Sequence, residues 1–134
     1  MKGYIVNIEE ETLNNKNFRR VLFTSHHAQL VVMSIPVGGE IGSETHTLDQ
    51  FLRIELGDAV VSLENEEFVV GKNFAIVIPA GTKHNVRNTH ATDPLQLYSL
   101  YSPPEHKDGT VHTTYADAQQ KEEHFDGQVS SGAK

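Results

Sequence analysis

GGEIGSETHTLDQFLRIELG, at residues 38–57, is the stretch of sequence that decides the fold, together with PAGTKHNVRN at residues 79–88. Both combine glycines, which permit tight turns, with histidine and with acid or amide side chains that can bind a metal ion. Across residues 52–56, apolar residues occupy the even positions and polar residues the odd ones. This alternation predicts a strand with one buried and one exposed face.

Outside these stretches, short apolar runs separated by turn residues continue from residue 4 to residue 101. Many short strands at close spacing, without helical periodicity, predict an all-β sandwich or barrel. Two helical segments are expected, one turn at Glu9–Asn14 and a longer one at Thr114–Glu123, which begins with a capping box. The expected strands are Tyr4–Ile8, Arg20–Thr24, Gln29–Ile35, Phe51–Leu56, Ala59–Leu63, Phe68–Val70, Ala75–Ile78 and Leu95–Tyr101.

The chain of 134 residues has the length of one domain. No linker or internal repeat divides it, so we expect a single domain over residues 1–134 with a barrel core at about 18–102. Residues 124–134 have the composition of a flexible tail.

Composition excludes several classes of function. The chain has no cysteine, which rules out disulfides, thiolate metal sites and thiol catalysis. Its net charge of −7 argues against a nucleic-acid partner. No signal-peptide pattern and no apolar run of membrane-spanning length are present, so a cytoplasmic protein without a membrane partner is expected.

Strand periodicity predicts that four side chains able to bind a metal converge inside the barrel. Gln50 has the parity of the inward apolar set, Glu44 and His46 share a face, and His84 shares its face with Val86. Singly, these residues could be buried histidines, a solvated acid and a glutamine that only hydrogen-bonds a ligand. Together, Glu44, His46, Gln50 and His84 predict a site for one divalent ion. If residues 47–49 form a loop, the alternation of side chains does not extend from Gln50 back to Glu44 and His46.

The two stretches resemble the paired motifs of the cupin superfamily. In the second motif Pro79, Gly81, His84 and Asn88 match, while Asn73 stands in place of the first glycine. In the first motif Gly38, His46 and Gly57 keep the family spacing. Glu44 stands where the family has its first histidine, and Gln50 stands where it has glutamate.

The resemblance implies a double-stranded β-helix, or jelly-roll, barrel, here with a short C-terminal helix. The donor set of two histidines and one carboxylate, Glu44, His46 and His84, is typical of non-haem iron and is also accepted by manganese, nickel and zinc. The chain looks like the small mannose-6-phosphate isomerase-like cupins. That likeness implies an enzyme acting on a small polar, sugar-like molecule, by isomerase-type or dioxygenase-type chemistry. The alternative is a non-catalytic cupin that binds or senses a small ligand.

Two further features carry expectations. The segment at residues 102–112 is either a proline-stiffened loop that closes the barrel edge, or it places His106 or His112 at the pocket mouth as an acid–base group. Phe51 has the outward parity, and an exposed aromatic residue on a sheet predicts a subunit interface. We therefore expect a homodimer.

Overall fold

The computed structural model describes residues 3–131, and its elements confirm the all-β class predicted from the sequence. The elements are α1 (Ile8–Asn14), β1 (Arg19–Thr24), β2 (Gln29–Ile35), β3 (Asp49–Leu56), β4 (Asp58–Leu63), β5 (Glu66–Gly71), β6 (Ala75–Ile78), β7 (His84–Asn88), β8 (Leu95–Ser102), β9 (Val111–His112) and α2 (Tyr115–Gln120). Neither helix is long and apolar enough to cross a membrane.

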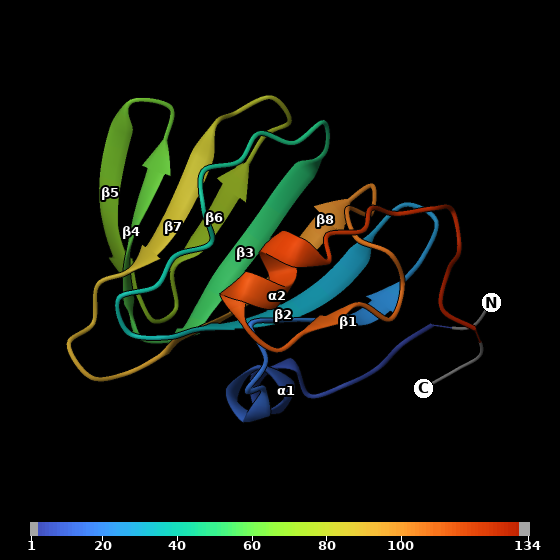
Figure 1. Ribbon diagram of the computed structural model, residues 1–134, viewed down its shortest axis with the longest axis horizontal. Helices are drawn as coiled ribbons and strands as arrows, with labels where there is room; N and C mark the ends of the chain where they lie inside the picture. Colours follow the sequence, from blue (N-terminus) through green and yellow to red (C-terminus); the bar gives the residue numbers. More distant parts are fainter. Residues whose placement is uncertain (1–2, 132–134) are drawn as a thin grey trace.

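The strands form two antiparallel sheets that pack as a jelly-roll barrel (Figure 1). The larger sheet has the order β6-β3-β8-β2-β1-β9, and the smaller has the order β5-β4-β7. Apolar side chains from both sheets, among them Met33, Leu52, Ile54 and Val61, are almost fully buried and form the core.

One cross-strand row brings polar side chains into the barrel. Gln29 pairs with Tyr101, and Tyr101 pairs with Gln50. Residues directly opposite one another point to the same face of a sheet. All three are buried, so Gln50 lies inside the barrel as its parity predicted. The row therefore places the amide of Gln50 and the phenol of Tyr101 side by side inside the barrel.

Turn chemistry explains why the two motifs keep their shape. Gly57 has a φ of 102°, and a Cβ atom there would lie 2.8 Å from the Pro94 carbonyl oxygen. A side chain at this position is therefore excluded both by conformation and by space. Asn73, which stands in place of the motif's first glycine, has a φ of 75°, in the left-handed region that glycine and asparagine adopt most readily.

The N-terminal prediction was wrong, because Tyr4–Ile8 does not form a strand. Asn7 instead caps α1: its side-chain oxygen accepts a hydrogen bond from the backbone N–H of Glu10 at 3.1 Å. Tyr4 stacks on Phe23 at 5.2 Å between ring centroids. Tyr4 thus packs against a side chain of β1 without strand pairing, whereas Ile5 is 92% exposed.

The C-terminal region also differs from expectation. Helix α2 is shorter than predicted, although Thr114 does cap it by accepting from the backbone N–H of Asp117 at 3.1 Å. The expected tail makes contacts: the backbone N–H of Phe125 donates to the Glu105 carbonyl, and that of Ser130 to the Thr24 carbonyl, each at 2.9 Å. Residues 132–134 of that tail lie outside the described residues.

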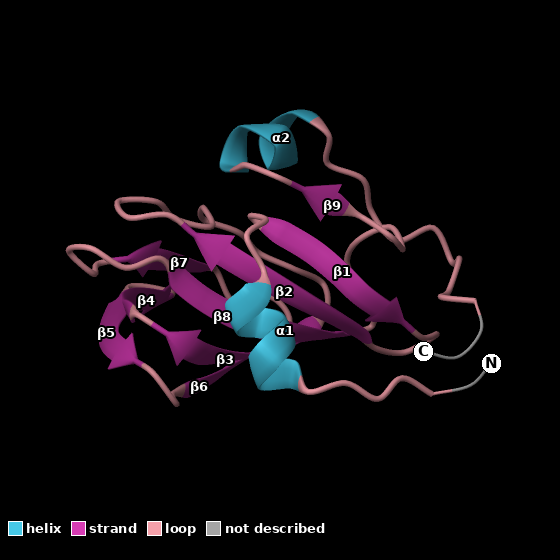
Figure 2. Ribbon diagram, turned by 90° about the horizontal axis from the view of Figure 1, so that it is seen from below, coloured by secondary structure: helices cyan, strands magenta, loops and turns pink. Residues whose placement is uncertain are grey.

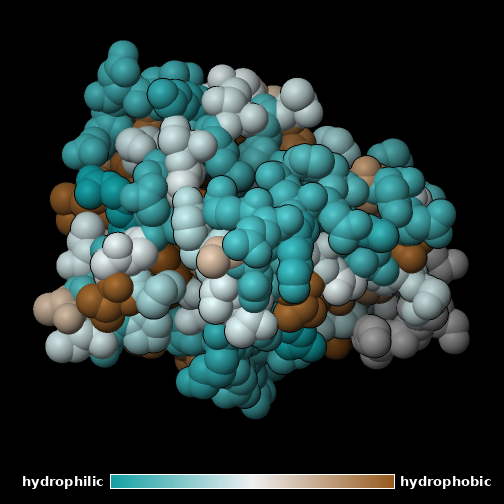
Figure 3. All heavy atoms as spheres, viewed as in Figure 1, coloured by the Kyte–Doolittle hydropathy of each residue, from teal (hydrophilic) through white to brown (hydrophobic). Residues whose placement is uncertain are grey.

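The two helices cover different parts of the larger sheet. Helix α1 packs against β8, β2 and β3, whereas α2 lies beside β9 at the sheet edge (Figure 2). Hydrophilic residues dominate the face seen in Figure 1, and hydrophobic residues surface at its left end, where β5 is drawn (Figure 3).

Candidate metal centre

A short bridge between the two motifs creates the candidate site. Glu44 lies in the loop before β3, and His84 is the first residue of β7. The backbone N–H of each donates to the carbonyl of the other, both at 2.9 Å. The backbone N–H of Gly81 also donates to the His46 carbonyl at 2.8 Å. These bonds hold together two loops that are far apart in sequence.

Three of the four predicted ligands form a cluster. Glu44, His46 and His84 each offer one ligand atom, and these atoms lie within 4.8 Å of one another. The His46 and His84 rings are 5.2 Å apart, and Glu44 Oε1 is 3.6 Å from His46 Nε2. Two imidazoles and one carboxylate are a donor set that iron, manganese, nickel and zinc all accept.

Both histidines have one ring nitrogen occupied. His84 Nδ1 lies 2.9 Å from the Thr82 carbonyl, and His46 Nδ1 lies 2.7 Å from Glu105 Oε2. A carbonyl or a carboxylate can only accept, so Nδ1 donates in each ring and Nε2 is left for a ligand. His46 Nε2 is buried without a hydrogen-bond partner, as an atom reserved for a metal ion would be.

Gln50, the fourth predicted ligand, lies next to this cluster on β3. Its Nε2 atom donates to Ser99 Oγ at 3.2 Å and to the Tyr101 hydroxyl at 3.4 Å. Its Oε1 atom is buried and has no hydrogen-bond partner. Tyr101 in turn packs edge-on against His46 at 6.0 Å. An amide held by its nitrogen, with the oxygen free, fits the role of a neutral oxygen donor.

Glu105 pairs with His46 electrostatically. Burial alone would lower the pKa of His46, but the nearby carboxylates of Glu105 and Glu44 outweigh it and raise the pKa from 6.5 to about 9. Burial would raise the pKa of Glu105, and the contact with His46 outweighs it and lowers that pKa. In the metal-free protein these two side chains form an ion pair at neutral pH.

Metal uptake should therefore depend on pH. A raised pKa favours the protonated ring, so an ion has to displace one proton from His46, and affinity should rise about tenfold per pH unit until about pH 9. Calorimetric titration with manganese between pH 6.5 and 8.5, in two buffers of different ionisation enthalpy, should show about one proton released per ion. Affinity that stays flat over this range would contradict the His46 assignment.

A cavity of about 400 Å³ opens beside His46. Residues 45–48 line one side of it, and Pro103, Pro104 and Glu105 line the other, together with His124 and Phe125. His124 is mostly exposed, and its Nδ1 lies 3.6 Å from Glu105 Oε1. Neither His106 nor His112 lines this cavity, so the structure does not place them at its mouth.

Both of those histidines are buried instead, at 5% and 3% exposure. His112 Nδ1 lies 3.2 Å from Arg19 Nη1, and its Nε2 lies 3.3 Å from the Lys121 carbonyl. The His106 ring packs edge-on against Tyr101 at 5.3 Å. Burial, followed by the charge of Arg19, lowers the pKa of His106 well below its usual range, so this ring is neutral.

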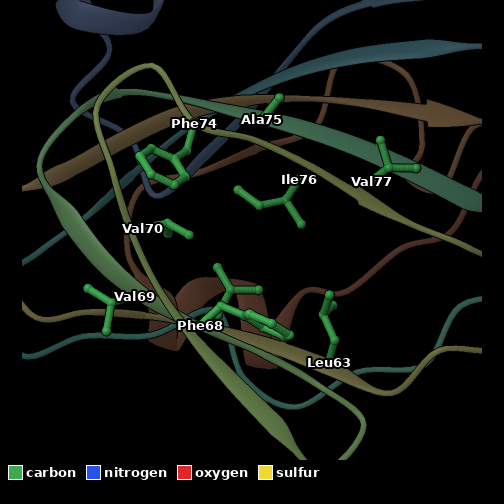
Figure 4. A pocket seen from close by; sticks show the side chains of 9 residues that line it. Leu63, Phe68, Val69, Val70, Phe74, Ala75, Ile76 and Val77 are labelled. Carbon is green, nitrogen blue, oxygen red and sulfur yellow. The ribbon is translucent and has the colours of Figure 1, made fainter.

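A second concave surface lies between the edge strands β5 and β6 (Figure 4). It measures about 340 Å³, and its lining consists entirely of apolar residues, among them Phe68, Phe74 and Val77. No side chain there can bind a metal ion or move a proton. The polar cavity beside His46 is therefore the better candidate for chemistry.

Two residues of the site were not predicted, Glu105 and His124. Glu105 belongs to the Pro103-Pro104-Glu105 segment, whose fold over the first motif has no local sequence signal. His124 was assigned to the tail. The one available signal is that Glu105 directly follows two prolines, which restrict the backbone and so hold its carboxylate in place.

Comparisons with known proteins point to one family. The cupin domain family matches residues 31–101, about half of the chain. The crystal structure of BH2720 from Bacillus halodurans is 49% identical, with a TM-score of 0.87, over 89% of this chain and 95% of that one. The crystal structure of TT1209 from Thermus thermophilus is 24% identical, with a TM-score of 0.66, over 74% and 96% of the two chains.

A relative from Bacillus subtilis (strain 168), the uncharacterized protein YrkC, is 48% identical over 124 residues. The match covers 87% of this chain and 66% of YrkC, so this chain spans just under two thirds of that relative.

Proposed function

Because this chain belongs to the cupin family, we propose that it binds one divalent ion through Glu44, His46 and His84, with Gln50 as a further oxygen donor, and acts through that ion on a small polar molecule. The observation that carries the proposal is the convergence of three ligand atoms within 4.8 Å, with the second nitrogen of each ring already hydrogen-bonded. When bound, the ion would supply a Lewis acid that polarises an oxygen-bearing group of the ligand.

The residues of the chain have separate roles in this proposal. Glu105 orients His46 and keeps its Nε2 directed at the ion, as carboxylates beside metal-ligating histidines commonly do. Tyr101 and Ser99 fix the amide of Gln50. The cavity beside His46 admits the ligand, and Thr45 and Thr47 are among the residues that line it. Iron, manganese, nickel and zinc are the candidate ions.

We propose an enzyme of isomerase type or dioxygenase type, the two reactions implied by the family resemblance. One observation favours the non-catalytic alternative: Glu105 and His46, two titratable groups lining the cavity, are paired with each other, which leaves His124 as the acid–base group at its mouth. Product analysis with a panel of small sugars and sugar acids, with and without oxygen, separates the three possibilities. Turnover that needs oxygen indicates the dioxygenase, and binding without turnover indicates the alternative.

The metal proposal predicts about one divalent ion per chain. Elemental analysis of protein purified without a chelator or a histidine tag measures this directly. His84→Ala provides the matched control, since it removes one ligand and should arrive without metal. The proposal fails if the wild-type chain is metal-free and takes up none of the four candidate ions at micromolar concentration.

We also propose that the chain forms a homodimer through the outer face of the larger sheet. Strand pairing places an apolar row across five strands of this face: Val77, Phe51, Leu100, Leu30 and Phe23. Val77 is 64% exposed and Leu100 is 39% exposed. Asp49 and Arg53 flank Phe51 on the same face, so a two-fold axis along the row would set Arg53 against Asp49 of the partner subunit.

The dimer proposal predicts about twice the chain mass of 14.9 kDa in light scattering at micromolar concentration. Phe51→Ser should shift the protein toward the monomer, because it removes the central apolar side chain of the row. Phe74→Ser is a control, since Phe74 is exposed in the groove of Figure 4 and outside this row. A wild-type monomer would show that the row is an ordinary surface.

A further inference from the structure

Arg19 is a buried cation whose charge no acidic side chain offsets. It is 5% exposed and points into the barrel, because it pairs with the fully buried Met33 on β2 and with His112 on β9. Within residues 3–131, no carboxylate lies within ion-pair distance of its guanidinium group. Burying a charge without a counter-charge costs several kcal/mol of folding free energy. An arginine at this position therefore needs an explanation.

The neighbours of Arg19 are neutral. Arg19 Nη1 donates to His112 Nδ1 at 3.2 Å, and His112 Nε2, 3.3 Å from the Lys121 carbonyl, therefore carries the ring proton. The guanidinium carbon lies 5.4 Å from the centroid of the Phe18 ring. These contacts hold one edge of the guanidinium group and leave its Nε atom buried without a hydrogen-bond partner.

Three further buried polar atoms of the described residues lack partners, and all belong to side chains that contact Tyr101. They are His106 Nε2, Gln50 Oε1 and His46 Nε2. The rings of His106 and His46 pack edge-on against Tyr101 at 5.3 and 6.0 Å, and Gln50 Nε2 reaches its hydroxyl at 3.4 Å. Arg19 and His106 are both buried, and each offers a nitrogen atom that has no hydrogen-bond partner.

We propose that the barrel interior binds a small organic acid, with the carboxylate of the ligand held by Arg19 and His106. The rest of the ligand passes Tyr101 toward Glu44, His46 and His84, where a hydroxyl or carbonyl oxygen meets the metal ion. The guanidinium fork matches a carboxylate in charge and shape, and the ligand supplies the missing counter-charge. The contact with the ion rests on the proposed function, whereas the contact with Arg19 does not.

Entry of the acid requires movement of the protein. The unpartnered atoms are covered by surrounding residues. The segment Ser102–Lys107 carries His106, and its residues Pro103, Pro104 and Glu105 form one wall of the cavity beside His46. Outward movement of this segment would open the interior from that cavity.

Arg19 could instead have a purely structural role, in which it connects β9 to β1 through His112. The two roles predict opposite effects of Arg19→Met on the melting temperature. If Arg19 is structural, Arg19→Met destabilises the fold. If Arg19 awaits an anion, Arg19→Met removes an uncompensated buried charge and leaves the melting temperature equal or higher. Arg20→Met is the matched control, because Arg20 is the next residue and points to the opposite face.

The experiment combines thermal unfolding with calorimetry, using glycolate, oxalate and malonate as probes, and glycolamide and inorganic phosphate as comparisons. Metal-free and manganese-loaded proteins are measured in parallel. The acids should bind and stabilise the wild type and Arg20→Met, whereas glycolamide should not. Arg19→Met should bind the acids at least about 30-fold more weakly, the effect of removing one partner of a buried charge pair. Arg19→Lys, which keeps the charge without the fork, should fall between them.

The inference is overturned if no acid stabilises the wild type, if only phosphate does, if acid binding is unchanged in Arg19→Met, or if both Arg19 variants are less stable than wild type. Failure of the metal proposal looks different: the wild type takes up no ion, and acids still bind to it and to His84→Ala with the same dependence on Arg19. Metal uptake without acid binding leaves the metal proposal standing and removes this one.

Discussion

Glu44→Gln and His84→Ala should each weaken metal binding by at least about 100-fold, because changes to residues that merely support ligands already cost 10–100-fold. Glu44 offers a carboxylate, which both coordinates the ion and offsets its charge. Gln50 offers a neutral amide oxygen, so Gln50→Ala should have the smaller effect. The carboxylate that the family has at the position of Gln50 has moved, in this chain, to the position of Glu44.

Calorimetric titration of these variants with one metal establishes the ranking. Gln50→Glu should keep or strengthen binding, since it adds a second carboxylate, and it should lower the Lewis acidity of the ion. Glu40→Gln is a control in the same loop: Glu40 accepts from Asn85 Nδ2 at 3.2 Å and is absent from the ligand cluster. If Glu44→Gln binds metal as tightly as the wild type, Glu44 is not a ligand and the donor set of two histidines and one carboxylate is wrong.

Glu105→Leu should weaken metal binding by about 10- to 100-fold without removing a ligand. Glu105 fixes the ring of His46 through Nδ1 at 2.7 Å, and its charge raises the basicity of that ring. Glu105→Gln keeps an acceptor and loses the charge, so its effect should be smaller. In both variants the pKa of His46 in the metal-free protein should fall from about 9.

Proton NMR titration of the histidine rings measures that pKa, and calorimetry measures the affinity. Glu122→Gln is the matched control, because its carboxylate also lies near His124, at 3.8 Å, but does not contact His46. A His46 pKa that is unchanged in Glu105→Leu would show that the ion pair does not form in solution.

Most of the barrel could be predicted from the sequence, because its strands alternate clearly and end at turn residues. Gln29–Ile35 and Ala75–Ile78 have the predicted bounds. Strand β7 was not among the expected strands, since His84–Asn88 contains a single apolar residue. The prediction of a strand at Tyr4–Ile8 was wrong for the reverse reason: the segment has the composition of a strand, but no neighbouring strand pairs with it.

The candidate ligands could be found from parity and motif spacing, both of which are local. Glu44, His46 and His84 come together as predicted, and Gln50 lies beside them inside the barrel. Their coordination of an ion stays a prediction. Glu105 could not be found this way, because its contact with His46 depends on how the segment after β8 folds back over a loop almost sixty residues earlier.

The pair of backbone hydrogen bonds between Glu44 and His84 has a kinetic consequence. One of these residues lies in a loop and the other begins a strand, yet neither can leave its place without breaking both bonds. Local opening of the loop and departure of a bound ion would then be a single event. The residence time of the ion should therefore follow the hydrogen-exchange rates of these two amides, and the loop would behave as one unit with the strand.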